Sequence, residues 1–131
     1  MEDPRYSGEV LRRLRELPGT GPLPPAAGKV VTGHAGSTRD GAEVELEFAL
    51  RDDRIAAGRF RAYGCPHLIA AASWLTERAP GWQRQRLLDW HWREVAEALE
   101  VPPHKYGRLL VLQDAMRDAA GNWAGMPRST V

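Results

Sequence analysis

Residues 54–77, with the sequence RIAAGRFRAYGCPHLIAAASWLTE, decide the fold. The first ten residues alternate around Phe60, as a β-strand does. After Gly64 the pattern changes, because three consecutive alanines and apolar residues at helical spacing predict an α-helix. Proline suits the first position of a helix, so we expect the helix to begin at Pro66. A strand therefore passes directly into a helix, and Cys65 lies at or next to the N-cap.

Two runs before this stretch also predict strands. A short one covers residues 29–32. The other covers residues 43–50, where apolar and acidic residues alternate, so one face belongs to the core and the other faces solvent. The polar residues 51–54 predict a β-hairpin between this strand and the next. We expect arginines of the third strand to lie opposite its glutamates. In the third strand, strict alternation places Ile55 on the same face as Ala57, Arg59, Arg61 and Tyr63.

The remaining chain is helical or irregular. Residues 6–17 carry apolar residues at helical spacing and predict an amphipathic helix with arginines on its outer face. Residues 18–28 hold four prolines and three glycines and predict a linker. Residues 82–99 are helical in composition. A last helix is expected from residue 103 or 104 to Ala120, stopped by Gly121.

The order helix-strand-strand-strand-helix-helix-helix predicts an α+β fold, a three-stranded antiparallel meander packed on one face by helices. The length of 131 residues fits one domain, spanning 1–131. Within it, residues 1–28 form the N-terminal helix and linker, and residues 122–131 form a loose tail.

Composition excludes several kinds of function. The chain has one cysteine, which excludes an internal disulfide, a Cys-x-x-Cys redox pair and a site built from several thiolates of one chain. The net charge of +1 predicts no general affinity for nucleic acid or for an anionic membrane. Neither a targeting segment nor an apolar run long enough to cross a bilayer is visible, so we expect a cytoplasmic protein.

Cys65 has the most suggestive position for chemistry. The unbonded N–H groups and positive pole of a helix N-terminus favour a thiolate there, which is a good metal ligand or sulfur acceptor. The alternative is that this cysteine only fills space, as buried free cysteines often do. Position alone leaves both interpretations open.

The histidines and one aspartate are weaker candidates. A metal could use His67, which forms a Cys-x-His pair with Cys65, but two ligands are little support for a site. The other histidines, His34, His91 and His104, are each more typical of packing or surface positions. Asp40 precedes Gly41 in a dipeptide typical of turns, and it could also be half of a metal site.

The stretch 54–77 resembles the U-type iron–sulfur cluster scaffold family (IscU, SufU and the N-terminal part of NifU). In that family a strand ending in Arg-Phe-x-x-x-Gly-Cys is followed by a small-residue helix with Ala-x-x-Ser-x-x-Thr-Glu, and every one of these marks is present. Four flanking segments are similar too: Tyr6, residues 36–46, residues 101–105 and residues 113–115. The resemblance implies the same α+β fold and a role in iron–sulfur cluster assembly.

The ligand positions depart from the family pattern. The family holds its cluster or zinc with three cysteines, assisted by an aspartate or a histidine. Asp40 stands at the first cysteine position and Ala42 at the assisting aspartate. Cys65 keeps the second cysteine. Gly107 and Arg108 stand where the family has histidine and the third cysteine. The family ligand positions are thus Asp40, Cys65 and Arg108, with two of the three substituted.

This substitution pattern decides against ordinary scaffolding. An iron–sulfur cluster requires four good ligands, mostly thiolates. A cluster or zinc would find one thiolate, Cys65, with Asp40 and His104 as further ligands, and would bind weakly or across a dimer. Arg108 opposes a cation at the site and favours a thiolate or persulfide on the cysteine. Alternatively, an ion pair between Asp40 and Arg108 replaces the lost metal.

Three functions are compatible with the resemblance and the single cysteine. The first is a non-enzymatic accessory or regulatory module that binds a cysteine desulfurase or an Hsp70-type chaperone. For the chaperone, the similar segment implies contacts through Pro102, Pro103 and Lys105. The second is a SufE-like sulfur acceptor that carries a persulfide on Cys65. The third is a homodimer that bridges a cluster or metal through two Cys65 thiolates.

Overall fold

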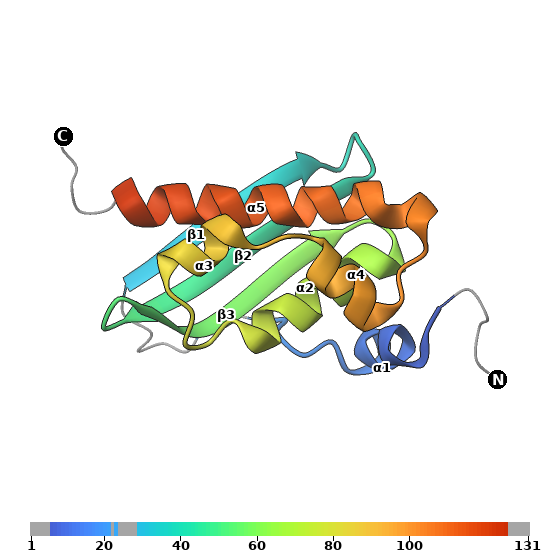
Figure 1. The fold of residues 1–131 in the computed structure, drawn as a ribbon, viewed down its shortest axis with the longest axis horizontal. Coiled ribbons are helices and arrows are strands. Elements are labelled where there is room, and N and C mark those ends of the chain that lie inside the picture. The colour runs from blue at the N-terminus through green and yellow to red at the C-terminus, as the bar shows by residue number, and fades with distance from the viewer. Residues whose placement is uncertain (1–5, 22, 24–28, 126–131) are drawn as a thin grey trace.

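The computed structural model describes residues 6–21, 23 and 29–125 (Figure 1). In chain order the elements are α1 (Gly8–Glu16), β1 (Lys29–Ser37), β2 (Ala42–Arg51), β3 (Arg54–Tyr63), α2 (Pro66–Arg78), α3 (Arg84–Asp89), α4 (Arg93–Leu99), the 3-10 helix η1 (Pro103–Lys105) and α5 (Tyr106–Gly125). This order confirms the predicted α+β class. Most of the predicted linker, residues 22 and 24–28, lies outside the described residues.

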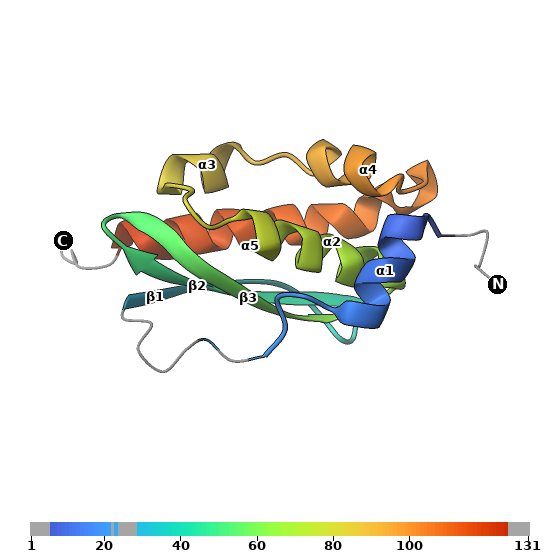
Figure 2. The same ribbon diagram turned by 90° about the horizontal axis from the view of Figure 1, so that it is seen from below.

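The three strands form an antiparallel meander in the order β1-β2-β3. Asp52 and Asp53 both have positive φ, which is the backbone that a two-residue hairpin turn needs. Figure 2 shows α2 and α5 on one face of the sheet, with α3 and α4 outside them. The predicted pairing across the hairpin is confirmed, because Arg61 lies opposite Glu45 and forms an ion pair with it.

The core lies between the sheet and the helices. The side chains of Val44, Leu46 and Phe48 on β2 are fully buried, as the alternation predicts. The helices contribute apolar side chains to the same cluster, among them Leu68, Leu75, Leu109, Leu112 and Met116. The predicted helical cover on one face of the sheet therefore exists.

The third strand does not alternate strictly. Ala49 pairs with Ala57, but Leu50 pairs with Ile55, so one extra residue of β3 forms a β-bulge. The bulge places Ile55 on the core side together with Gly58 and Phe60, all of which are buried. The prediction that Ile55 shares a face with the arginines is therefore wrong.

Strand β1 is five residues longer than predicted, because it continues through Gly33 and Gly36 to Ser37. Gly33 is where α5 crosses the strand. A Cβ on this residue would lie 2.1 Å from the carbonyl oxygen of Ala115. The glycine, which resembles a turn signal in the sequence, is required by this close approach.

Two helical predictions also need correction. The expected helix over 82–99 is two short helices, because the backbone is extended at the buried Trp90 between α3 and α4. The last helix does not stop at Gly121 but continues to Gly125, so the first residues of the expected tail are helical. Residues 126–131 lie outside the described residues. Among the helices described, none has the length and apolar character to span a bilayer.

Candidate functional site

The predicted site residues meet at one end of the molecule, where α2 and α5 begin and the β1–β2 turn lies (Figure 1). Cys65 is the N-cap of α2, and Asp40 belongs to the turn. His104 lies in η1, and Arg108 lies in the first turn of α5. Asp40, His104 and Arg108 line one shallow hollow at this end. The fold therefore gathers segments that are far apart in the sequence.

Glycine backbones bring the β1–β2 turn against the start of α2. Gly64 has φ 146°, and a Cβ there would lie 3.1 Å from the carbonyl oxygen of Gly41. A Cβ on Gly41 would in turn lie 3.6 Å from the Nη1 atom of Arg108. Gly41 therefore separates the Arg108 guanidinium from the backbone that leads into Cys65.

The carboxylate of Asp40 is used within its own turn. The carboxylate accepts a hydrogen bond of 2.9 Å from the Ser37 hydroxyl. The backbone N–H of Asp40 donates a hydrogen bond of 3.1 Å back to the Oγ atom of Ser37. Among the ion pairs of the described residues, none joins Asp40 to Arg108. The predicted ion pair that would replace the metal is therefore not formed.

The residues at this end do not fit a cluster or a zinc ion. Within residues 6–21, 23 and 29–125, no three side chains of His, Cys, Asp or Glu are placed to hold a metal. Cys65, Asp40 and His104 thus share one end of the fold without forming a ligand set. The Arg108 guanidinium adds a fixed positive charge beside Gly41, which disfavours a bound cation.

Cys65 begins α2 with an extended backbone (φ −72°, ψ 159°) and a half-buried side chain. Its side chain makes no capping hydrogen bond to the described backbone. Pro66 follows at the first helical position, as predicted. A half-buried thiol at an uncapped helix N-terminus has the positive helix pole beside it.

His67 is buried in the first turn of α2 and has only 3% of its surface exposed. Its ring packs 4.9 Å from the ring of Tyr6, and neither ring nitrogen has a hydrogen-bond partner within the described part of the chain. Burial lowers the pKa of His67, and the charges of Lys105 and His104 lower it further. The imidazole is therefore neutral at pH 7 and is a packing residue of this end.

The segment predicted to contact a chaperone lies beside the same end. Pro102 precedes η1, which Pro103 begins and Lys105 ends. Pro103 and His104 are exposed, and Lys105 is half-buried. A short 3-10 turn therefore presents these side chains to solvent.

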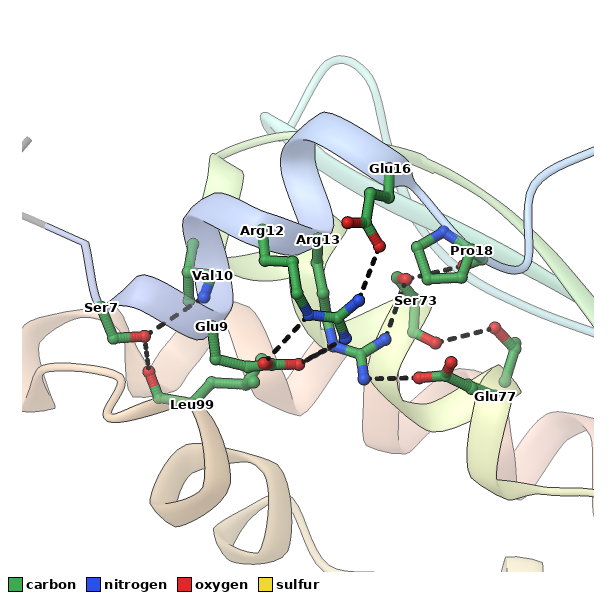
Figure 3. Close-up of polar contacts among 11 residues, drawn as sticks. Ser7, Glu9, Val10, Arg12, Arg13, Glu16, Pro18, Ser73, Glu77 and Leu99 are labelled. Carbon is green, nitrogen blue, oxygen red and sulfur yellow. Dashed lines mark hydrogen bonds and ion pairs between the residues drawn. The ribbon is translucent and has the colours of Figure 1, made fainter. Parts of the chain in front are cut away.

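A polar cluster that the sequence pattern did not reveal surrounds Arg13 between α1 and α2 (Figure 3). Arg13 was expected on the outer face of its helix, but its side chain is only 2% exposed. The guanidinium binds Ser73 and Glu77, two residues of the Ala-x-x-Ser-x-x-Thr-Glu motif. The available signal was spacing, because Arg13 lies three residues after the buried Val10, on the same side of the helix.

Comparison with known families places the chain. The sequence model of the family described as "NifU-like N terminal domain" matches residues 5–129. The chain belongs to this family. The fold and the helix after Cys65 agree with that membership, and the two substituted ligand positions make the chain a degenerate member with one of three ligand cysteines.

Individual relatives carry names of the same kind. The chain is 28% identical to the iron-sulfur cluster assembly scaffold protein IscU of Haemophilus influenzae over 90% of its own length and 94% of the relative. It is 30% identical to the nitrogen fixation protein NifU of Trichormus azollae over 78% of its own length, but it spans only 35% of that relative.

Solved structures agree on the fold. A putative iron-sulfur cluster assembly scaffold protein for the SUF system from Fervidobacterium islandicum is similar with a TM-score of 0.66 and 16% identity, covering 88% of this chain and 96% of that one. A NifU-like protein (N-terminal) from Brucella abortus gives a TM-score of 0.65 at 16% identity, covering 92% and 94%.

Proposed function

We propose that this chain acts in iron–sulfur cluster assembly as a scaffold-like binding module that does not hold a cluster within its own fold. One observation carries the proposal: the end that bears Cys65 has no three-residue ligand group among the described residues, and Arg108 lies against its turn. Family membership supports the pathway, and the degenerate ligand set supports an accessory or regulatory role instead of cluster carriage. The module binds other proteins and catalyses no reaction of its own.

The partner is a cysteine desulfurase or an Hsp70-type chaperone of the same pathway. The turn at Pro103 and Lys105 supports the chaperone as one of the two, because it presents an exposed proline next to a half-buried cation on a rigid segment. The rigid turn loses little conformational freedom on binding.

Co-purification from the native host tests this proposal. A tagged chain is expected to retain a desulfurase or an assembly chaperone. The double variant Pro103→Ala with Lys105→Ala should lose a bound chaperone, whereas Lys29→Ala, at the only other lysine of the chain, should keep it. Retention of neither partner by the unmodified chain would contradict the proposed function.

A second function, sulfur transfer, is favoured by the position of Cys65. Cys65 is the N-cap residue of α2, and its half-buried thiol makes no capping hydrogen bond to the described backbone. The guanidinium of Arg108 lies near Gly41, in the turn that packs against the start of α2. In this scheme the Cys65 thiolate attacks the outer sulfur of a donor persulfide. The new S–S bond forms as the old one breaks, and the donor leaves as a thiolate, so no external oxidant is needed.

Intact-mass measurement tests sulfur transfer. After incubation with a desulfurase and cysteine, the native chain should gain the mass of one sulfur atom, and Cys65→Ser should gain none. Arg108→Gln should load more slowly, because it removes a positive charge from the end of the fold that the anionic donor persulfide approaches. A native chain without the adduct, or a Cys65→Ser chain with it, excludes this function.

A further inference from the structure

Helix α1 is attached to the fold along α2. Figure 2 shows it at the end of the molecule where α4 also lies. Val10 and Arg13 are the buried residues of α1, and Leu14 packs only partly against the core. At the N-cap, the Ser7 hydroxyl donates a hydrogen bond of 2.8 Å to the carbonyl oxygen of Leu99 at the end of α4. The apolar area that holds this helix is therefore small.

The buried guanidinium of Arg13 supplies further contacts that hold α1 to α2. The Nε atom of Arg13 binds Glu9 at 2.6 Å, Nη2 binds Glu77 at 2.5 Å, and Nη1 lies 3.3 Å from the Oγ atom of Ser73. The Ser73 hydroxyl then donates to the carbonyl oxygen of Pro18 at 2.6 Å. We name Arg13, Glu9, Ser73 and Glu77 the Arg13 cluster (Figure 3).

The Arg13 cluster ties α1 to α2 through one side chain. A buried guanidinium is stable only while its partners are in place, so the bonds from Arg13 to Ser73 and Glu77 are lost together when α1 moves away. Both carboxylate side chains remain partly exposed, 35% for Glu9 and 45% for Glu77. Water therefore reaches both carboxylates, and elements with few apolar contacts are the ones that open below the global unfolding free energy.

The segment just before α1 lies over the start of α2. The ring of Tyr6 packs on the ring of His67, which is two residues beyond Cys65. His67 is 3% exposed in this arrangement. The same N-terminal segment thus contacts the second half of α2 through Arg13 and its first turn through Tyr6.

We propose that α1 is a latch over the Cys65 end: when the Arg13 cluster opens, α1 leaves α2 as a unit and uncovers His67 and the turn that holds Cys65. The identity of the protein that uses the uncovered turn rests on the proposed function. The opening itself depends only on this chain, so the two ideas fail separately.

Hydrogen–deuterium exchange tests the latch with a matched pair of variants. Arg13→Met removes the buried cation, and Arg12→Met removes its neighbour, which binds the same Glu9 with a side chain that is 36% exposed. Arg13→Met should speed exchange of the amides of residues 8–16 by at least about tenfold and leave those of β2 unchanged. Arg12→Met should change them by no more than about threefold. The latch is excluded if α1 exchange stays native in Arg13→Met, or if β2 accelerates as much as α1.

Alkylation of Cys65 by iodoacetamide tests what the latch covers. The rate should rise at least about tenfold in Arg13→Met and stay at the native value in Arg12→Met. An unchanged rate in a variant whose α1 exchanges rapidly overturns the covering role.

If Arg13→Met does not fold, Glu77→Gln replaces it, because this variant keeps the shape of the cluster and removes one charge. The amides of α1 should then exchange faster than in the native chain and more slowly than expected for Arg13→Met. Both assays use the isolated chain, so loss of partner binding does not affect them.

Discussion

The two halves of α2 both belong to the stretch 54–77 that resembles the family, but their side chains make different contacts. At its first turn, Cys65 has no partners that would make a metal site among the described residues, because Asp40 bonds within its own turn and Arg108 brings a positive charge beside Gly41. In its second half, Ser73 and Glu77 keep a full set of contacts to Arg13. Ser73 and Glu77 of the motif are therefore structural in this chain, because they hold α1 through Arg13. This role does not depend on a metal at the other end of α2.

The largest expected effect is on the Arg13 side of this comparison. Arg13→Met should lower the free energy of unfolding by about 2 kcal/mol, because Ser73 and Glu77 lose their charged hydrogen-bond partner. Arg108→Met, at the ligand end, should change it by less than about 0.5 kcal/mol. Urea unfolding followed by circular dichroism measures both. Similar losses in the two variants would erase the contrast between the halves of α2.

A smaller contrast is expected within α2 itself. Ser73→Ala removes a buried hydroxyl that donates to Pro18 and lies beside Arg13, and it should lower the free energy of unfolding by about 1–2 kcal/mol. Cys65→Ala should lower it by less than about 1 kcal/mol, because the thiol is half-buried and makes no capping bond to the described backbone. Thermal melts of the two variants at one pH measure which of them loses more stability. A larger loss in Cys65→Ala than in Ser73→Ala would contradict this prediction.

The next effect is a pH dependence that belongs to the ligand end. The pKa of His67 is lowered in the folded chain by burial and by Lys105 and His104, so the unfolded state takes up the proton first. Stability should be independent of this residue above about pH 6.5 and should fall as the pH drops below it, until the folded state is protonated too. His67→Phe should flatten this limb of the stability–pH curve. A native curve that rises on acidification has the wrong sign for a neutral buried imidazole.

The smallest expected effect is that of a chelator. EDTA should leave the melting temperature of the native chain unchanged, because the described residues place no ligand group for a metal. A drop after chelation, reversed by adding zinc, would show that a metal does stabilise this end.

Most of the fold follows from local patterns in the sequence. The alternation around Phe48 gives the central strand, and Asp52 with Asp53 gives the hairpin, because both depend on neighbouring residues only. The errors arise where a distant element decides. Gly33 resembles a turn residue until α5 crosses it, and the bulge at Ile55 depends on pairing with β2.

The sequence predicted which residues belong to the candidate site, but it did not predict how their side chains are bonded. The resemblance placed Asp40, Cys65 and Arg108 at one end of the fold, and the structure brings their segments together there. It could not show that the Asp40 carboxylate would bond Ser37 in preference to Arg108, since one turn of backbone decides that choice. The buried Arg13 was missed because arginine is almost never fully buried unless paired, and its partner Glu77 lies 64 residues away.

Metal and sulfide content is the most direct test of the central claim, that this fold persists without a metal site. The native chain and the restored variant Asp40→Cys, Ala42→Asp and Arg108→Cys are purified together without oxygen, and iron, zinc and acid-labile sulfide are measured per chain. The native chain should be colourless and hold none of the three in stoichiometric amount, whereas the restored variant, with three thiolates and a carboxylate, should bind zinc or a cluster. A native chain that carries a stoichiometric metal or cluster, within one chain or between two, would contradict the account.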